Sequence, residues 1–72
     1  MELKAGTYRH FKGGTYEVLF TAKSSENPEE QLVVYKSLDK GGVWVRPLHM
    51  FIEHIERDGY VGPRFKYIGH VE

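Results

Sequence analysis

The chain contains no cysteine among its 72 residues, so it has neither a disulfide framework nor a thiolate metal site. A small domain without disulfides is typical of the cytosol, and we therefore expect a cytoplasmic protein. No apolar run approaches the ~20 residues that a membrane-spanning helix needs, and the first residues lack the apolar segment of a signal peptide. We expect no membrane association and, since no cofactor motif is visible, no cofactor.

An excess of charge of either sign is also missing. Ten Lys and Arg residues balance ten Asp and Glu residues, giving a formal net charge of zero. Domains that hold nucleic acid by charge alone are usually clearly basic, so a nucleic-acid partner is the less favoured expectation, although a local basic patch is compatible with this balance. The length predicts a single domain over 1–72 that buries only about 60 % of its unfolded surface.

Short apolar segments rich in β-branched and aromatic residues alternate with turns rich in glycine and aspartate. This pattern is typical of a mainly β protein, and it predicts a small barrel or sandwich of about five short antiparallel strands with one or two helical turns. The expected strands are 6–11, 15–22, 32–38, 43–46 and 53–57, with further short extended segments at 60–62 and 65–68. The last residues, 69–72, are expected to fray.

Residues 43–51 hold the single tryptophan of the chain and combine it with an arginine and several large apolar residues. Alternation along a strand places Val43 and Val45 on one face, with Trp44 and Arg46 on the other. Pro47 has no N–H for a sheet ladder, so the strand should end there. The region therefore presents one fixed positive charge beside one large aromatic ring.

The segment after Pro47 supports two structures. Leu48, Phe51, Ile52 and Ile55 have helical spacing, which would allow one helix from 47 to 57. However, the residues from Ile52 to Ile55 also suit a short strand that runs into a turn at 58–59. We favour one or two helical turns at 47–52 followed by a strand at 53–57.

The strand predicted at 15–22 has the most regular alternation. Tyr16, Val18, Phe20 and Ala22 would share one face. A domain of this size needs its aromatic residues inside, so we expect Tyr16 and Phe20 in the core. Tyr8 and Trp44 fit a core position and an exposed aromatic groove about equally well.

Five groups of residues follow one another along the chain: Tyr8-Arg9-His10-Phe11-Lys12-Gly13, Tyr16-Glu17-Val18, Leu32-Val33-Val34-Tyr35, Trp44-Val45-Arg46-Pro47-Leu48-His49-Met50-Phe51 and Pro63-Arg64-Phe65. In this order they resemble a family of small, uncharacterised, mostly bacterial domains of unknown function. The resemblance spans roughly residues 7 to 68 and implies a small SH3-like β-barrel, with no assigned activity. One departure is the run at 24–27, where members of the family usually have His-Ser-Glu-Thr.

Arg46 is the first candidate binding residue, because a guanidinium group forms a fork that fits phosphate or carboxylate. The alternative is a structural arginine that stacks on an aromatic ring or pairs with Glu17 or Glu53. Arg64 has the same two interpretations, and its place beside Pro63 in a turn predicts an exposed side chain. Candidate ligand-binding residues are Arg46, Trp44, His10, Tyr8 and Arg64.

These residues favour a non-catalytic binding module for a peptide or a small anionic metabolite such as a nucleotide. One alternative is an enzyme, or an accessory domain of an enzyme, with a pocket around His10, Arg46 and Glu53; a nucleic-acid binder is a third class. No nucleophile with an orienting base is visible, so we name no catalytic residue. His49 and His54 are five residues apart, which misses the helical spacing of a zinc pair, and His10 and His70 lie far away in sequence. No metal site is predicted.

Overall fold

The computed structural model describes residues 3–69, which form seven strands and one helical turn. The strands are β1 (Gly6–His10), β2 (Thr15–Lys23), β3 (Gln31–Ser37), β4 (Val43–Pro47), β5 (His54–Arg57), β6 (Tyr60–Pro63) and β7 (Phe65–Gly69). The helical turn α1 (Leu48–Phe51) connects β4 to β5. The predicted mainly β, antiparallel architecture is confirmed.

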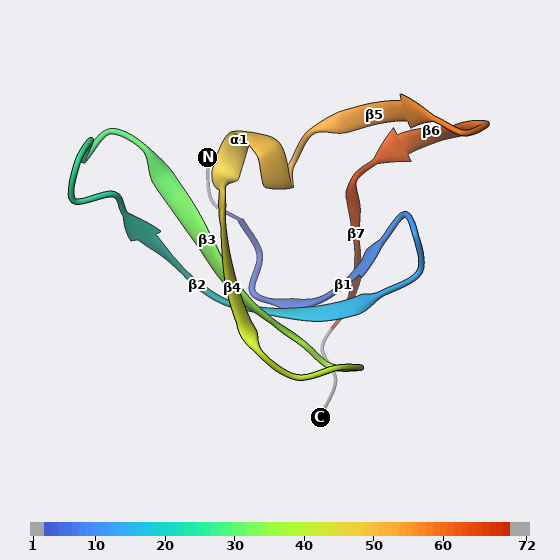
Figure 1. Ribbon diagram of the computed structural model, residues 1–72, viewed down its shortest axis with the longest axis horizontal. Helices are drawn as coiled ribbons and strands as arrows, with labels where there is room; N and C mark the ends of the chain where they lie inside the picture. The colour runs from blue at the N-terminus through green and yellow to red at the C-terminus, as the bar shows by residue number, and fades with distance from the viewer. Residues whose placement is uncertain (1–2, 70–72) are drawn as a thin grey trace.

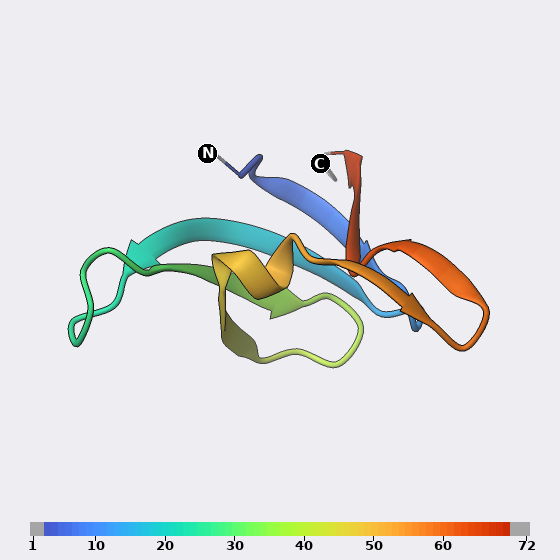
Figure 2. The same ribbon diagram turned by 90° about the horizontal axis from the view of Figure 1, so that it is seen from above.

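Five of the strands form one antiparallel sheet in the order β4-β3-β2-β1-β7, and β5 and β6 form a separate two-stranded ribbon (Figure 1). The sheet curves beneath α1, and the ribbon extends from the same side (Figure 2). β4 and β7 are the two edges of the sheet and do not pair with each other, so no closed barrel is detected over residues 3–69. The prediction of about five strands was too low, because the short extended segments near 60 and 65 are strands in their own right.

The core lies between the inner face of the sheet and α1. Its centre is Phe51, which is 1 % exposed and stacks face to face on Phe65 with ring centroids 4.1 Å apart. Tyr8 and Tyr35 meet Phe51 edge-on, each at 5.4 Å. Aromatic rings therefore fill most of the space that so short a chain can enclose, as expected for a domain with little aliphatic volume. Val18 and Val33 complete the buried set.

β2 departs from the predicted alternation at one residue. Val18 pairs with Tyr35 and Phe20 pairs with Val34, so the register shifts at Leu19 as a β-bulge. The extra residue in β2 turns the following side chains to the opposite face. Phe20 is consequently 58 % exposed, and the prediction that it lies in the core is wrong, whereas Val18 before the bulge is buried.

The favoured structure after Pro47 is confirmed. Pro47 has φ −54° and ψ 139°, which is extended backbone, and it is the last residue of β4. The Ile52 N–H donates to the Leu48 carbonyl at 3.0 Å and ends the single turn, so a helix from 47 to 57 does not form. Ile55 reaches the interior from β5 instead.

The expected fraying after residue 68 is wrong for Gly69, which pairs with Thr7 at the end of β7. The rest of that prediction, for residues 70–72, lies outside the described residues. No helix in the described part of the chain has the length and apolar character to cross a membrane.

Candidate anion-binding site

Trp44 and Arg46 lie on the inner face of the sheet, at its β4 edge. Trp44 is opposite Tyr35 and Arg46 is opposite Val33, and both of these partners are buried. Cross-strand partners point to the same side of a sheet, so the predicted shared face of Trp44 and Arg46 agrees with the register. The indole of Trp44 is nonetheless 55 % exposed, because β4 is an edge strand and nothing in the described chain covers it.

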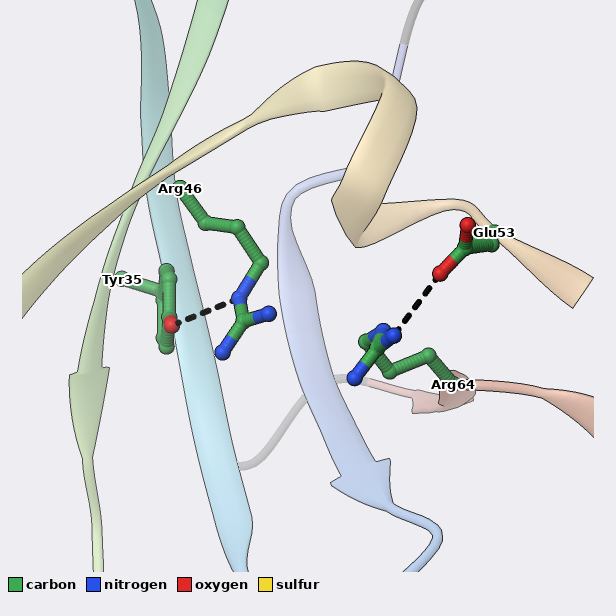
Figure 3. A network of polar contacts seen from close by, with 4 residues as sticks. All are labelled: Tyr35, Arg46, Glu53 and Arg64. Carbon is green, nitrogen blue, oxygen red and sulfur yellow. Dashed lines mark hydrogen bonds and ion pairs between the residues drawn. The ribbon is translucent and has the colours of Figure 1, made fainter. Parts of the chain in front are cut away.

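Arg46 is held by aromatic residues. Its Nε donates a hydrogen bond of 3.3 Å to the Tyr35 hydroxyl, and its guanidinium carbon lies 5.7 Å from the centre of the Phe65 ring (Figure 3). Stacking on a ring was one of the predicted alternatives for Arg46. The predicted ion-pair partners are engaged elsewhere, since Glu17 pairs with Lys36 and Glu53 pairs with Arg64.

Arg64 stands on the other side of α1. Its Nη2 donates to Glu53 Oε1 at 2.7 Å, and Figure 3 shows Glu53 reaching it from the segment that follows α1. The predicted exposure of Arg64 is wrong: its side chain is only 12 % exposed. The backbone explains the burial, because the Arg64 N–H donates to the Glu53 carbonyl and its own carbonyl accepts from the Phe11 N–H. These bonds hold the residue inside the turn between β6 and β7.

The charge around Arg64 is only partly compensated. The hydrogen bond from Arg64 is the main reason that the pKa of the Glu53 carboxyl lies below its ordinary value. Glu53 is therefore a bound carboxylate and is poorly placed to accept a proton from a substrate. The Nε of Arg64 is buried and has no hydrogen-bond partner among residues 3–69. An unpaired buried donor of this kind is uncommon in folded proteins and calls for an explanation.

The positive charges of both Arg46 and Arg64 act on His10. Burial is the largest cause that lowers the pKa of its imidazole, and the charges of Arg46, Arg64 and Lys12 lower this pKa further. Its Nδ1 accepts a hydrogen bond of 3.1 Å from the Lys12 N–H, so the neutral ring carries its proton on Nε2. The ring also meets Phe65 edge-on at 4.9 Å. His10 is thus a neutral neighbour that adds no further positive charge.

Of the five predicted ligand-binding residues, Arg46 and His10 contact the Phe65 ring and Arg64 directly precedes it, whereas Trp44 lies exposed on β4. Tyr8 is only 5 % exposed, and its hydroxyl donates to the Lys4 carbonyl at 2.7 Å, so it belongs to the core. Within the described residues, no three His, Asp or Glu side chains gather where they could hold a metal ion. His70, one of the histidines considered for such a site, lies outside these residues.

Phe65 was not predicted as part of the site. It forms the floor, with Arg46 above its ring and His10, Tyr35 and Tyr16 at its edge. The one hint in the sequence was that Phe65 directly follows Arg64. The role of Phe65 in the site depends on which strand pairs with β7, and the local sequence does not determine that pairing.

Replacement of Trp44 by alanine is expected to lower the free energy of unfolding by about 1 kcal/mol, far less than the 3–5 kcal/mol of a fully buried tryptophan. Half of the indole already contacts water, so little buried surface is lost. For a domain of this length the melting temperature should fall by about 4–8 °C. Thermal unfolding followed by circular dichroism measures this, and a loss above about 3 kcal/mol would contradict the exposed position.

This small, mainly β domain carries Arg46 and Arg64 on what we call the two-arginine face, beside the exposed Trp44. Comparison with known proteins places the chain in a family. Residues 6–67 match the model described as "Protein of unknown function (DUF1653)". The chain belongs to this family. Its fold is similar to a crystal structure of a protein belonging to DUF1653 from Bordetella bronchiseptica, with a TM-score of 0.86 and 35 % identity over 99 % of this chain and 94 % of the other. No curated protein matches the chain.

Proposed function

We propose that this domain is a non-catalytic binding module that recognises a phosphate or carboxylate group of a small metabolite, nucleotide or peptide. Arg46 makes the main contact, Arg64 and His10 assist, and Trp44 provides a flat apolar surface next to the charge. The SH3-like architecture stays a prediction that rests on the family resemblance. The cytoplasmic location stays a prediction that rests on the absence of cysteine.

The observation that carries the proposal is an excess of positive charge on a half-buried face. Glu53 pairs with Arg64, and neither of the salt bridges between described residues includes the guanidinium of Arg46. Arginine cannot lose its proton in a protein, so its remaining donors must find an anion or water. A bound anion would satisfy the donors of Arg46 that have no carboxylate partner.

Geometry adds a reason for a ligand with two parts. Trp44 and Arg46 are two residues apart on one strand, which separates their Cα atoms by about 7 Å. A ligand could therefore place a ring or an apolar side chain on the indole and its negative group on the guanidinium. Aromatic rings are effective platforms for such groups because they bury a large area and lose little conformational freedom.

The engagement of Glu53 favours binding over catalysis. An enzyme built on His10, Arg46 and Glu53 would need one free carboxylate or imidazole to transfer a proton. Glu53 is held by Arg64 at 2.7 Å, and the acceptor nitrogen of His10, Nδ1, is taken by the Lys12 N–H, while burial and the neighbouring cations lower the pKa of the imidazole. The same cations suit the recognition of an anion, which needs positive charge and no proton transfer.

A thermal-shift screen of the wild type and of Arg46→Ala with phosphates, nucleotides and carboxylates tests the proposal. A ligand at about 100 times its Kd stabilises the folded state by about 2.7 kcal/mol, which raises the melting temperature of a small domain by about 10 °C or more. Arg46→Ala should lose this increase. Without ligand it should melt only slightly lower, because its bond to Tyr35 contributes about 1 kcal/mol.

Two matched variants make the result specific. Arg57→Ala removes an equal charge from an exposed position on β5 and should keep the ligand response. Arg46→Lys keeps the charge and loses the fork, so it should respond weakly. A wild type that no anion stabilises, together with an Arg46→Ala variant that melts much lower, would show that Arg46 is structural.

A further inference from the structure

A second basic surface lies on the outer face of the sheet. Arg9 of β1 is directly opposite Lys66 of β7, and both side chains are exposed. The residues that flank Arg9 point inward, since Tyr8 is buried and His10 contacts Phe65, so Arg9 points away from the two-arginine face. Like charges directly opposite one another destabilise a sheet. Neither salt bridge between described residues includes Arg9 or Lys66.

Aromatic rings border this pair of cations. Phe11 and Tyr60 stack with ring centroids 5.6 Å apart and an angle of 23° between their planes. A hollow of about 290 Å³ joins the rings to the cations, and its lining is Arg9, His10, Phe11, Gly13, Tyr60, Lys66 and Ile68. The Lys12 ammonium lies 5.7 Å from the centre of the Phe11 ring but does not line the hollow itself.

We infer that this hollow binds a nucleotide unit, either free or within a single strand of nucleic acid. Side chains that are opposite one another in an antiparallel pair have Cβ atoms about 5 Å apart, so one phosphate group can contact both Arg9 and Lys66. The base then packs against the wall formed by Phe11 and Tyr60. Stacking on such rings tolerates any base, because every base has a π-face.

A net charge of zero over the whole chain is compatible with a locally basic surface. The ten acidic residues cancel the ten basic ones overall, but no acidic side chain lines the hollow. Two phosphate contacts, from Arg9 and Lys66, would give a plot of log K against log salt a slope of about −1.4 for a single strand. The repulsion between Arg9 and Lys66 in the free protein is relieved when the phosphate binds.

The test uses the whole chain with two probes, adenosine monophosphate in a thermal-shift assay and a labelled oligothymidylate of about eight nucleotides in fluorescence anisotropy. Lys66→Glu should weaken binding at least about tenfold and bring the salt slope to about −0.7. Without ligand, Lys66→Glu should melt at the wild-type temperature or higher, because it converts a repulsive cross-strand pair into an attractive one. A response to adenosine monophosphate that Lys66→Glu loses assigns a free nucleotide to the hollow, and such a response to the oligonucleotide alone assigns a strand.

Two further variants test whether the probes bind at the hollow itself. Lys23→Glu makes the same change of charge at the far end of β2 and should bind both probes like the wild type. Arg46→Ala removes the main contact proposed for the inner face, so binding that Arg46→Ala retains and Lys66→Glu loses is binding at the hollow. The inference is overturned if the wild type binds neither probe, if Lys66→Glu binds like the wild type, or if Lys23→Glu loses as much. Loss in Arg46→Ala with full binding in Lys66→Glu would overturn it and support the inner site.

Discussion

Replacement of Phe51 by alanine is expected to lower the free energy of unfolding by about 3–5 kcal/mol. The ring is 1 % exposed, stacks on Phe65 at 4.1 Å and meets Tyr8 and Tyr35 at their edges. Its loss opens a cavity where α1 closes the sheet. A 72-residue domain has a total stability of about 4–11 kcal/mol, so this one change should remove a large part of it. Urea denaturation followed by circular dichroism measures the effect.

Ile52 provides the matched control for this prediction. It directly follows Phe51, but 37 % of it is exposed, so Ile52→Ala should cost about 1 kcal/mol. The pair compares a buried and a partly exposed apolar residue at one place in the chain. Equal losses for the two variants would mean that Phe51 does not form the centre of the core.

Replacement of Gly6 by alanine is expected to cost about 2–6 kcal/mol, from two effects that add. Gly6 has φ +136°, where a side chain strains the backbone by about 1–3 kcal/mol. An added Cβ would also lie 2.9 Å from Tyr67 Cε1 and 3.0 Å from the carbonyl oxygen of Gly69. Overpacking of this kind costs about 1–3 kcal/mol, because a backbone oxygen has little freedom to move. Thermal and urea unfolding both measure the loss.

Gly13 separates the two effects. It has φ +109°, and an added Cβ would meet no atom within 4 Å. Gly13→Ala should therefore show the backbone strain alone, about 1–3 kcal/mol. A Gly6→Ala variant that is no less stable than Gly13→Ala would contradict the close contact between the ends of β1 and β7.

The sequence predicted the elements well where local chemistry decides them. The break between the first two predicted strands, which contains Gly13 and Gly14, and the end of β4 at Pro47 follow from glycine conformations and from the missing proline N–H. The helical turn after Pro47 followed by β5 was also predicted, although the apolar spacing equally allowed a longer helix. With a single helical turn, Phe51 packs in the core and Ile55 is buried as a residue of β5.

The sequence failed where partners distant in the chain decide the outcome. Phe20 is exposed because β2 carries a bulge at Leu19, and a bulge is visible only in the register with β3. Arg64 is buried because its backbone bonds to Glu53 and Phe11, which are 11 and 53 positions away. No local pattern around Pro63 contains that information.

In both candidate sites, some features follow from the sequence and others depend on the tertiary structure. The shared face of Trp44 and Arg46 is a consequence of strand alternation, so the sequence by itself determined it. The sequence also determined the mainly β class and the balance of charge. Tertiary structure alone decided that β4 is an edge strand, which leaves Trp44 exposed, and that Glu53 neutralises Arg64 and not Arg46. It likewise decided that Arg9 lies opposite Lys66, because strand order and register depend on contacts among the whole set of strands.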